Sequence, residues 1–182
     1  MNLAFLTEQL SNYQQKLLNL CEKFPEDYKH QYHPDLSPLG WHLGHCVYTE
    51  TYWIREQLLG QAIPDQTLKS YYVPELAKKS DRGEALPEHP DLCQWARENQ
   101  QKNLQLISQY QNANLNDHPL MQNCFLLHFL IQHYAQHFEI MHMVLLHIAL
   151  QNSGDFKVQQ PLTNGEINTS TVDLNAGSYM IG

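Results

Sequence analysis

Apolar side chains recur every three or four residues in four long stretches of this chain, and this pattern restricts it to a helical fold. The spacing is that of one face of an α-helix. The first predicted helix covers residues 3–24 and ends before a proline, and the second covers residues 39–59 and ends at a glycine. The third begins near Pro90, and the fourth runs from about residue 117 to residue 151. Four such helices predict an all-α four-helix bundle.

The second and third predicted helices are joined by a long connection, residues 61–88, which contains three prolines and a glycine. We expect one crossover loop of about 25 residues here, since most connections in compact domains are far shorter. After Ser153 the helical period is lost, and only a short alternation at residues 171–174 favours a strand. A single strand forms no sheet. We therefore expect a helical domain at residues 1–152 and a short non-helical C-terminal tail at residues 153–182.

The charge of the chain excludes some classes of partner. Its 182 residues include 11 Lys and Arg against 19 Asp and Glu, a net charge of −8 with neutral histidines. This balance disfavours nucleic acid and an anionic membrane surface. No apolar run reaches the length of a membrane span, and the N-terminus does not resemble a secretory signal. Four scattered cysteines without a Cys-x-x-Cys pair predict reduced thiols of no catalytic role and a cytoplasmic location.

Histidine is unusually frequent, at 11 residues. His133 and His137 stand four apart on the fourth predicted helix, so their rings project from one face, among Leu and Met. This geometry suits two ligands of one metal ion, and buried imidazoles without partners are costly. The alternative is a pair of hydrogen-bonded core histidines.

A third ligand must come from another helix, and the second helix offers His42 and His45. His45 shares an aromatic stripe with Trp41, whereas His42 is turned about 60° away at 100° per residue. His45 is therefore the better inward candidate, although a lone histidine beside a tryptophan can also be an ordinary core residue. The prediction is a metal-binding triad of His45, His133 and His137.

Two motifs carry a family resemblance. Residues 37–45 read Ser-Pro-Leu-Gly-Trp-His-Leu-Gly-His, and residues 133–139 read His-Tyr-Ala-Gln-His-Phe-Glu. The first resembles the second-helix signature of the DinB-like (DinB/YfiT) superfamily. The second resembles the His-Glu-x-x-His-x-Glu motif of the N-terminal domain of ergothioneine-type iron-dependent sulfoxide synthases. Residues 70–72, 79–83 and 86–87 fit the loop pattern of the same branch, and the resemblance covers about residues 1–152.

The resemblance implies a cofactor and a ligand set. His45, His133 and His137 would hold Fe(II), with Zn or Ni as alternatives. Three neutral imidazoles leave coordination positions for a thiolate and for dioxygen. The implied partner is a small-molecule thiol or a histidine-derived substrate.

The resemblance also implies two substrate-binding residues and leaves the catalytic residues unknown. Gln136 would lie near the substrate, and Arg82 would help to hold the carboxylate of the thiol. The chain departs from the pattern at Tyr134, where a Glu is expected, and at Lys78 and Lys79, where arginines are usual.

Residues 172–182 resemble the first strand of the second domain of these synthases, a formylglycine-generating-enzyme-like fold. We therefore expect a truncated second domain, and a chain that is incomplete as an enzyme for oxygen-dependent thiol–imidazole coupling. Two alternatives remain open. One is a DinB-like metal-dependent thiol transferase or hydrolase that uses Zn or Ni. The other is a non-enzymatic helical bundle that forms a homodimer and keeps a vestigial metal site.

Overall fold

Four long helices make up most of the computed structural model, which describes residues 3–63, 65, 67–112, 118–153 and 177. These helices are α1 (Leu3–Lys23), α2 (Leu39–Thr51), α4 (His89–Asn112) and α5 (Phe125–Ser153). No strand occurs among the described residues. The predicted all-α four-helix bundle is confirmed.

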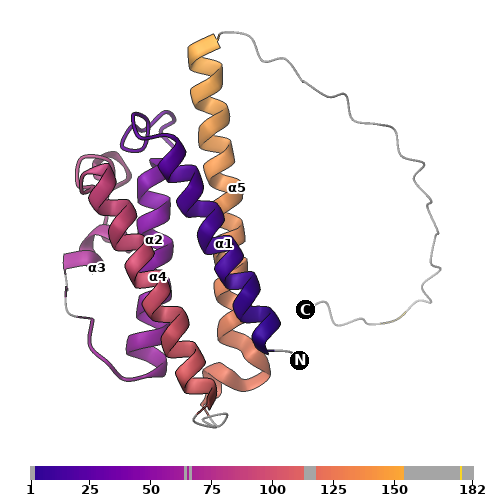
Figure 1. Ribbon diagram of the computed structural model, residues 1–182. Helices are drawn as coiled ribbons and strands as arrows, with labels where there is room; N and C mark the ends of the chain where they lie inside the picture. Colours follow the sequence, from indigo (N-terminus) through magenta and orange to yellow (C-terminus); the bar gives the residue numbers. More distant parts are fainter. Residues whose placement is uncertain (1–2, 64, 66, 113–117, 154–176, 178–182) are drawn as a thin grey trace.

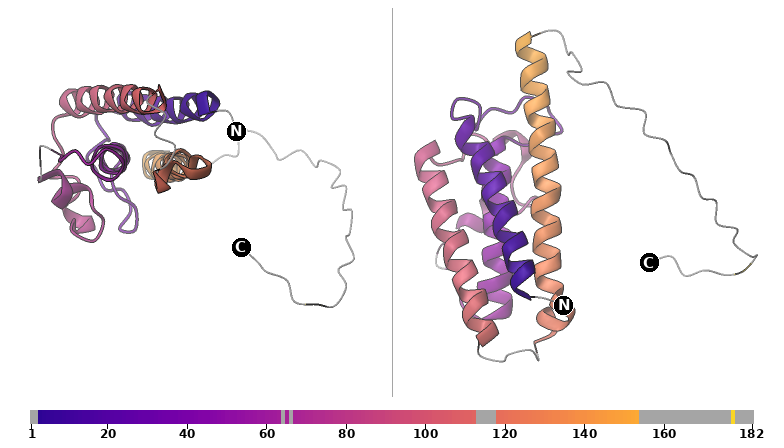
Figure 2. Two further views of the ribbon diagram at one scale, coloured as in Figure 1. Left: turned by 90° about the horizontal axis from the view of Figure 1, so that it is seen from below. Right: turned by 45° about the vertical axis from the view of Figure 1, so that its right-hand side comes forward.

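The four helices form two layers that share one core. α1 and α2 each pack against both α4 and α5, and the view along the bundle shows α1 beside α4 in one layer (Figure 2). α2 and α4 run in the same direction (Figure 1), so the chain between them must cross the length of the bundle. This crossover is not a plain loop as predicted, because it contains the short helix α3 (Thr67–Tyr72) and the 3-10 turn η2 (Lys79–Asp81).

α2 is the central helix, and almost every residue in it is buried. It continues directly into the π-helix η1 (Tyr52–Leu58) and stops before Gly60, whose φ of +63° is the left-handed conformation that glycine adopts at helix ends. Ser37, a residue type that often caps helices, does not cap α2. The N-cap residue is Pro38, and the Ser37 hydroxyl instead accepts a hydrogen bond from Arg82 (2.7 Å).

The last long helix begins later than predicted. Residues Pro119–Cys124 form the 3-10 helix η3, and α5 begins only at Phe125. Asn123 and Cys124 have φ values of +52° and +59°, which interrupt the α-helical backbone at this point. Within the described ranges, no helix combines the length and apolar character needed to cross a membrane. Apart from Ser153 and Gly177, the predicted tail and its strand lie outside the described residues.

Candidate metal centre

Histidines from α2 and α5 meet in the interior of the bundle. The Nε2 atoms of His45 and His133 lie 3.1 Å apart, and the Nδ1 atoms of His42 and His137 lie 2.9 Å apart. One ring nitrogen from each of His45, His133 and His137 lies within 4.8 Å of the others. The fold thus brings together the three histidines of the predicted triad, together with a fourth.

The ring of His45 is held in place from two sides. Its Nδ1 lies 2.6 Å from the backbone carbonyl oxygen of Tyr72, at the end of α3, and its face stacks on Trp41 at a centroid distance of 4.8 Å. A carbonyl can only accept, so Nδ1 carries the proton and donates it. Nε2 therefore keeps its lone pair toward His133, which is the arrangement that metal-binding histidines commonly adopt.

The distances suit a shared metal ion. Two nitrogens that are each 2.0–2.1 Å from one metal, at an angle between 90° and 109°, lie about 2.8–3.4 Å apart. The separation of 3.1 Å between His45 and His133 falls in this range. Nδ1 of His133 and Nε2 of His42 are buried without a hydrogen-bond partner. Each such atom costs about 1–3 kcal/mol. Neither is a nitrogen of the facing pair of His45 and His133, so a metal ion bound by the triad would leave both unpaired.

Burial keeps these imidazoles neutral. It lowers the pKa of His42 to about 3, of His133 to about 4 and of His137 to about 2, and the neighbouring histidines add to the effect. The pKa of His45 is also lowered, mainly by burial. A neutral imidazole offers the lone pair that a metal ligand requires, so no proton has to leave before a metal binds.

His42 is the member of the cluster that sequence reasoning missed. The expectation that it turns away from the site is wrong, because its side chain is only 4% exposed and contacts His137. A side chain that is offset by 60° around the helix axis leaves the core only if that side of the helix faces solvent. Almost no residue of α2 faces solvent. The all-round apolar character of residues 39–59 was the signal that could have placed it.

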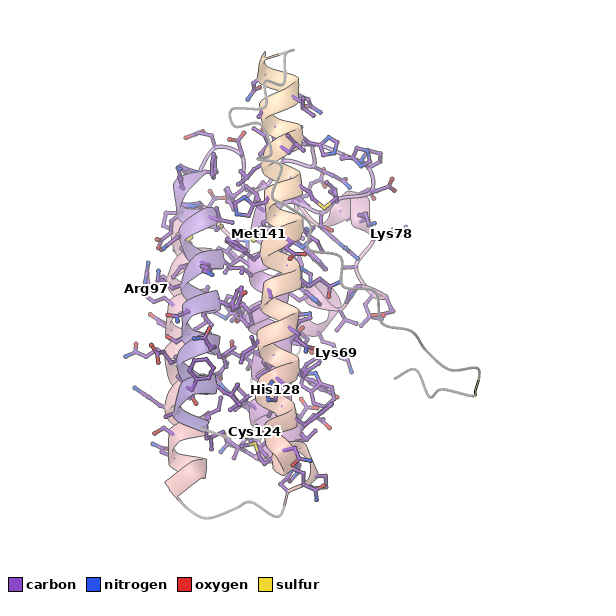
Figure 3. The ribbon with its side chains drawn as sticks, turned by 90° about the vertical axis from the view of Figure 1, so that its right-hand side faces the viewer. Lys69, Lys78, Arg97, Cys124, His128 and Met141 are labelled. Carbon is purple, nitrogen blue, oxygen red and sulfur yellow. The ribbon has the colours of Figure 1, made fainter. Side chains whose placement is uncertain are left out.

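Two clefts open beside His45. One, of about 320 Å³, is lined by His42, His45 and His137 together with Lys79 and Arg82. The other, of about 290 Å³, is lined by His45 and by four aromatic residues of α2, η1 and α3: Tyr48, Tyr52, Trp53 and Tyr72. Lys69 also lines this aromatic cleft, and Figure 3 shows it on the same side of α5 as Lys78, with Arg97 on the opposite side.

The two predicted substrate-binding residues have different surroundings. Arg82 is buried, lies 3.9 Å from the centroid of the Trp41 ring and donates hydrogen bonds to Ser37 and to the Pro74 and Ala77 carbonyls. It anchors the crossover to α2 and borders the charged cleft. Gln136 lies one residue before His137 on α5, and its side chain is exposed.

Tyr134 belongs to the core and lies outside the cluster. It is fully buried, and its hydroxyl donates to Oε2 of Glu50 at 2.5 Å. Gln14 on α1 donates to both oxygens of the same carboxylate at 2.9 Å. Burial raises the pKa of Glu50 to about 7 although these hydrogen bonds oppose the shift. This network joins α1, α2 and α5 directly behind the histidines.

One protein family matches the sequence of this bundle. Residues 9–141, which are most of the chain, match the family model of the DinB superfamily. The chain therefore belongs to the DinB superfamily. No curated protein matches it.

Proposed function

We propose that this bundle holds one divalent metal ion, with His45, His133 and His137 as its ligands and Fe(II) as the ion. The observation that carries the proposal is the convergence of three neutral imidazoles within 4.8 Å, two of them buried and that of His133 half-buried. The facing nitrogens of His45 and His133 are separated by a distance suited to one metal. Bound iron would supply affinity for a thiolate and the capacity to reduce dioxygen. By this proposal the chain is similar in function to the iron module of the sulfoxide synthases, a domain that acts in thiol–imidazole coupling.

The clefts support a small thiol substrate that carries a carboxylate. Lys79 and Arg82 place positive charge at the cleft that His42, His45 and His137 line. Most N–H groups of Arg82 are engaged by the protein, so its contribution is mainly electrostatic attraction. The aromatic cleft on the other side of His45 suits a flat ring such as a histidine-derived imidazole. Gln136, exposed at the edge of the cluster, is available to a substrate.

Neutral imidazoles also form normal catalytic zinc sites. A zinc- or nickel-dependent thiol transferase or hydrolase is therefore the second candidate. The metal that the purified wild type retains and His45→Ala lacks separates it from the first. A bundle that binds no metal at all, with its helices intact, would be the non-enzymatic alternative.

The test of the metal site is stoichiometry in single variants. We expect about one Fe(II) per chain after anaerobic loading, and loss of most of it in His45→Ala, His133→Ala and His137→Ala. His128→Ala and His142→Ala are the matched controls on α5 and should bind as the wild type does. If all five variants bind alike, the proposed triad is wrong.

A second experiment tests the substrate class by itself. The Fe(II)-loaded protein is titrated anaerobically with 3-mercaptopropionate and with 2-mercaptoethanol, which differ in the carboxylate. We expect tighter binding of the carboxylated thiol, and a smaller difference at high salt because charge attraction is screened. Equal affinities would contradict the carboxylate proposal and leave the metal site standing.

A further inference from the structure

A second cluster of metal-ligating side chains lies between α1 and α4, helices that contribute nothing to the histidine cluster. Cys21, His89 and Cys93 each place a ligand atom within 4.8 Å of the other two. Both thiols are buried, with Cys21 0% and Cys93 5% exposed, and the His89 side chain is half-buried. Cys21 and Cys93 stand far apart in the sequence, so no spacing motif predicts this cluster.

The backbone positions all three side chains. Cys21 lies in the last turn of α1, while His89 and Cys93 stand four apart in the first turns of α4, so they share one face of that helix. The His89 ring packs edge-on against Tyr28 at a centroid distance of 5.0 Å. Its Nε2 lies 3.0 Å from the Cys21 carbonyl oxygen and 3.6 Å from the sulfur of Cys93.

We propose that Cys21, His89 and Cys93 form a second metal site, which takes a thiophilic divalent ion such as zinc and joins the end of α1 to the start of α4. A sulfur 2.3 Å and a nitrogen 2.0–2.1 Å from one tetrahedral ion lie about 3.5–3.6 Å apart. The separation between Cys93 and His89 is 3.6 Å. The exposed side of His89 leaves a fourth position to water.

Charge favours such an ion in this place. Two thiolates neutralise a divalent cation, which suits a pair of buried sulfurs. The nearby charges of Glu22 and Arg97 already compensate each other in an ion pair. The hydrogen bond between the two thiols lowers the pKa of Cys93 and raises the pKa of Cys21, so the pair shares one proton that a metal ion must displace.

Replacing the hydrogen bond of His89 by a bond to zinc is energetically favourable. Binding through Nε2 would cost His89 its hydrogen bond with the Cys21 carbonyl. Two bonds from thiolates to zinc are much stronger than one such hydrogen bond. The ion would stabilise the folded chain, because α1 and α4 bring the three ligands together only when the bundle is folded.

Cobalt(II) titration of the full chain tests the proposal, because only sulfur ligands give a thiolate-to-cobalt charge-transfer band in the near ultraviolet. We expect this band to saturate within two equivalents, because the histidine cluster also takes a divalent ion, and to disappear on addition of Zn²⁺. Cys21→Ser and Cys93→Ser should each lose it. Cys46→Ala, which removes another buried thiol, is the matched control and should keep it. Absence of the band from the wild type, or its persistence in both serine variants, would overturn the proposal.

A measurement on the wild type guards against variants that fail to fold. Zinc binding at two thiols releases protons at neutral pH, whereas the neutral imidazoles of the histidine cluster have none to release and a water on that zinc contributes only part of one proton. Calorimetric titration in two buffers of different ionisation enthalpy gives the number released. We expect at least one proton for the zinc bound at the cysteines. Zinc binding without any proton release would overturn the proposal and leave the histidine site unaffected.

Discussion

His45 Nδ1 lies 2.6 Å from the backbone carbonyl oxygen of Tyr72, and this contact links the short helix α3 to the candidate metal centre. Tyr72 can approach so closely because the residue before His45 is Gly44. A Cβ atom at Gly44 would lie 2.2 Å from the Tyr72 ring. The crossover between α2 and α4 therefore sets the orientation of a proposed ligand, although it contributes no ligand itself.

Gly44→Ala should weaken metal binding without removing a ligand. The added methyl group must push Tyr72 away, which costs about 1–3 kcal/mol of stability and releases the His45 ring. Loss of such an orienting partner typically lowers metal affinity 10–100-fold. Gly60→Ala is the control. Nothing lies within 4 Å of its added Cβ, but its φ of +63° makes the change destabilising. It should reduce thermal stability and leave metal affinity intact, as measured by competition with a chelating dye.

His42→Phe should retain one metal ion per chain with an affinity reduced about 10–100-fold. His42 lies 2.9 Å from His137, so we expect it to orient that ligand and not to bind the metal. Metal content after loading and affinity from chelator competition are both required. Complete loss of metal would make His42 a fourth ligand, and unchanged affinity would remove it from the site.

The buried histidines should make the metal-free protein sensitive to acid. The pKa of His137 is about 2 in the folded state and 6.5 when unfolded, so below pH 6.5 the unfolded chain binds the extra proton. The contribution of His137 to stability is therefore fully present above pH 6.5. It falls by about 1.4 kcal/mol per pH unit as the pH decreases below this value. Urea unfolding at pH 7 and at pH 5 gives the free energies of unfolding of the wild type and of His137→Gln. The wild type should lose more stability than His137→Gln between pH 7 and pH 5. A constant difference would contradict the prediction.

Glu50 should have the opposite pH dependence. Burial raises its pKa to about 7 from 4.5, so the folded state holds a proton that the unfolded chain has already released. Its contribution is fully present below pH 4.5 and is lost as the pH rises through 7. Relative to the wild type, Glu50→Gln should gain stability between pH 5 and pH 8, by up to about 3 kcal/mol. Urea unfolding at the two pH values measures this shift, and Glu56→Gln on the same stretch is the control.

The sequence by itself determined the helices and the pair on α5. Apolar spacing of three and four residues requires helices, and the four-residue step between His133 and His137 places both rings on one face. The length of residues 61–88 indicated a crossover. These features depend on neighbours along the chain, and the period of the helix fixes them before any packing occurs.

Only the tertiary structure decided which residues from different helices meet. His42 joins the cluster because α2 is buried on every side, and Cys21 meets Cys93 because α1 and α4 pack together at that end. Glu50, Gln14 and Tyr134 form one network although they are distant in sequence. The reason is physical. Spacing fixes the direction of a side chain around its own helix, whereas its partner depends on how two helices rotate and slide against each other.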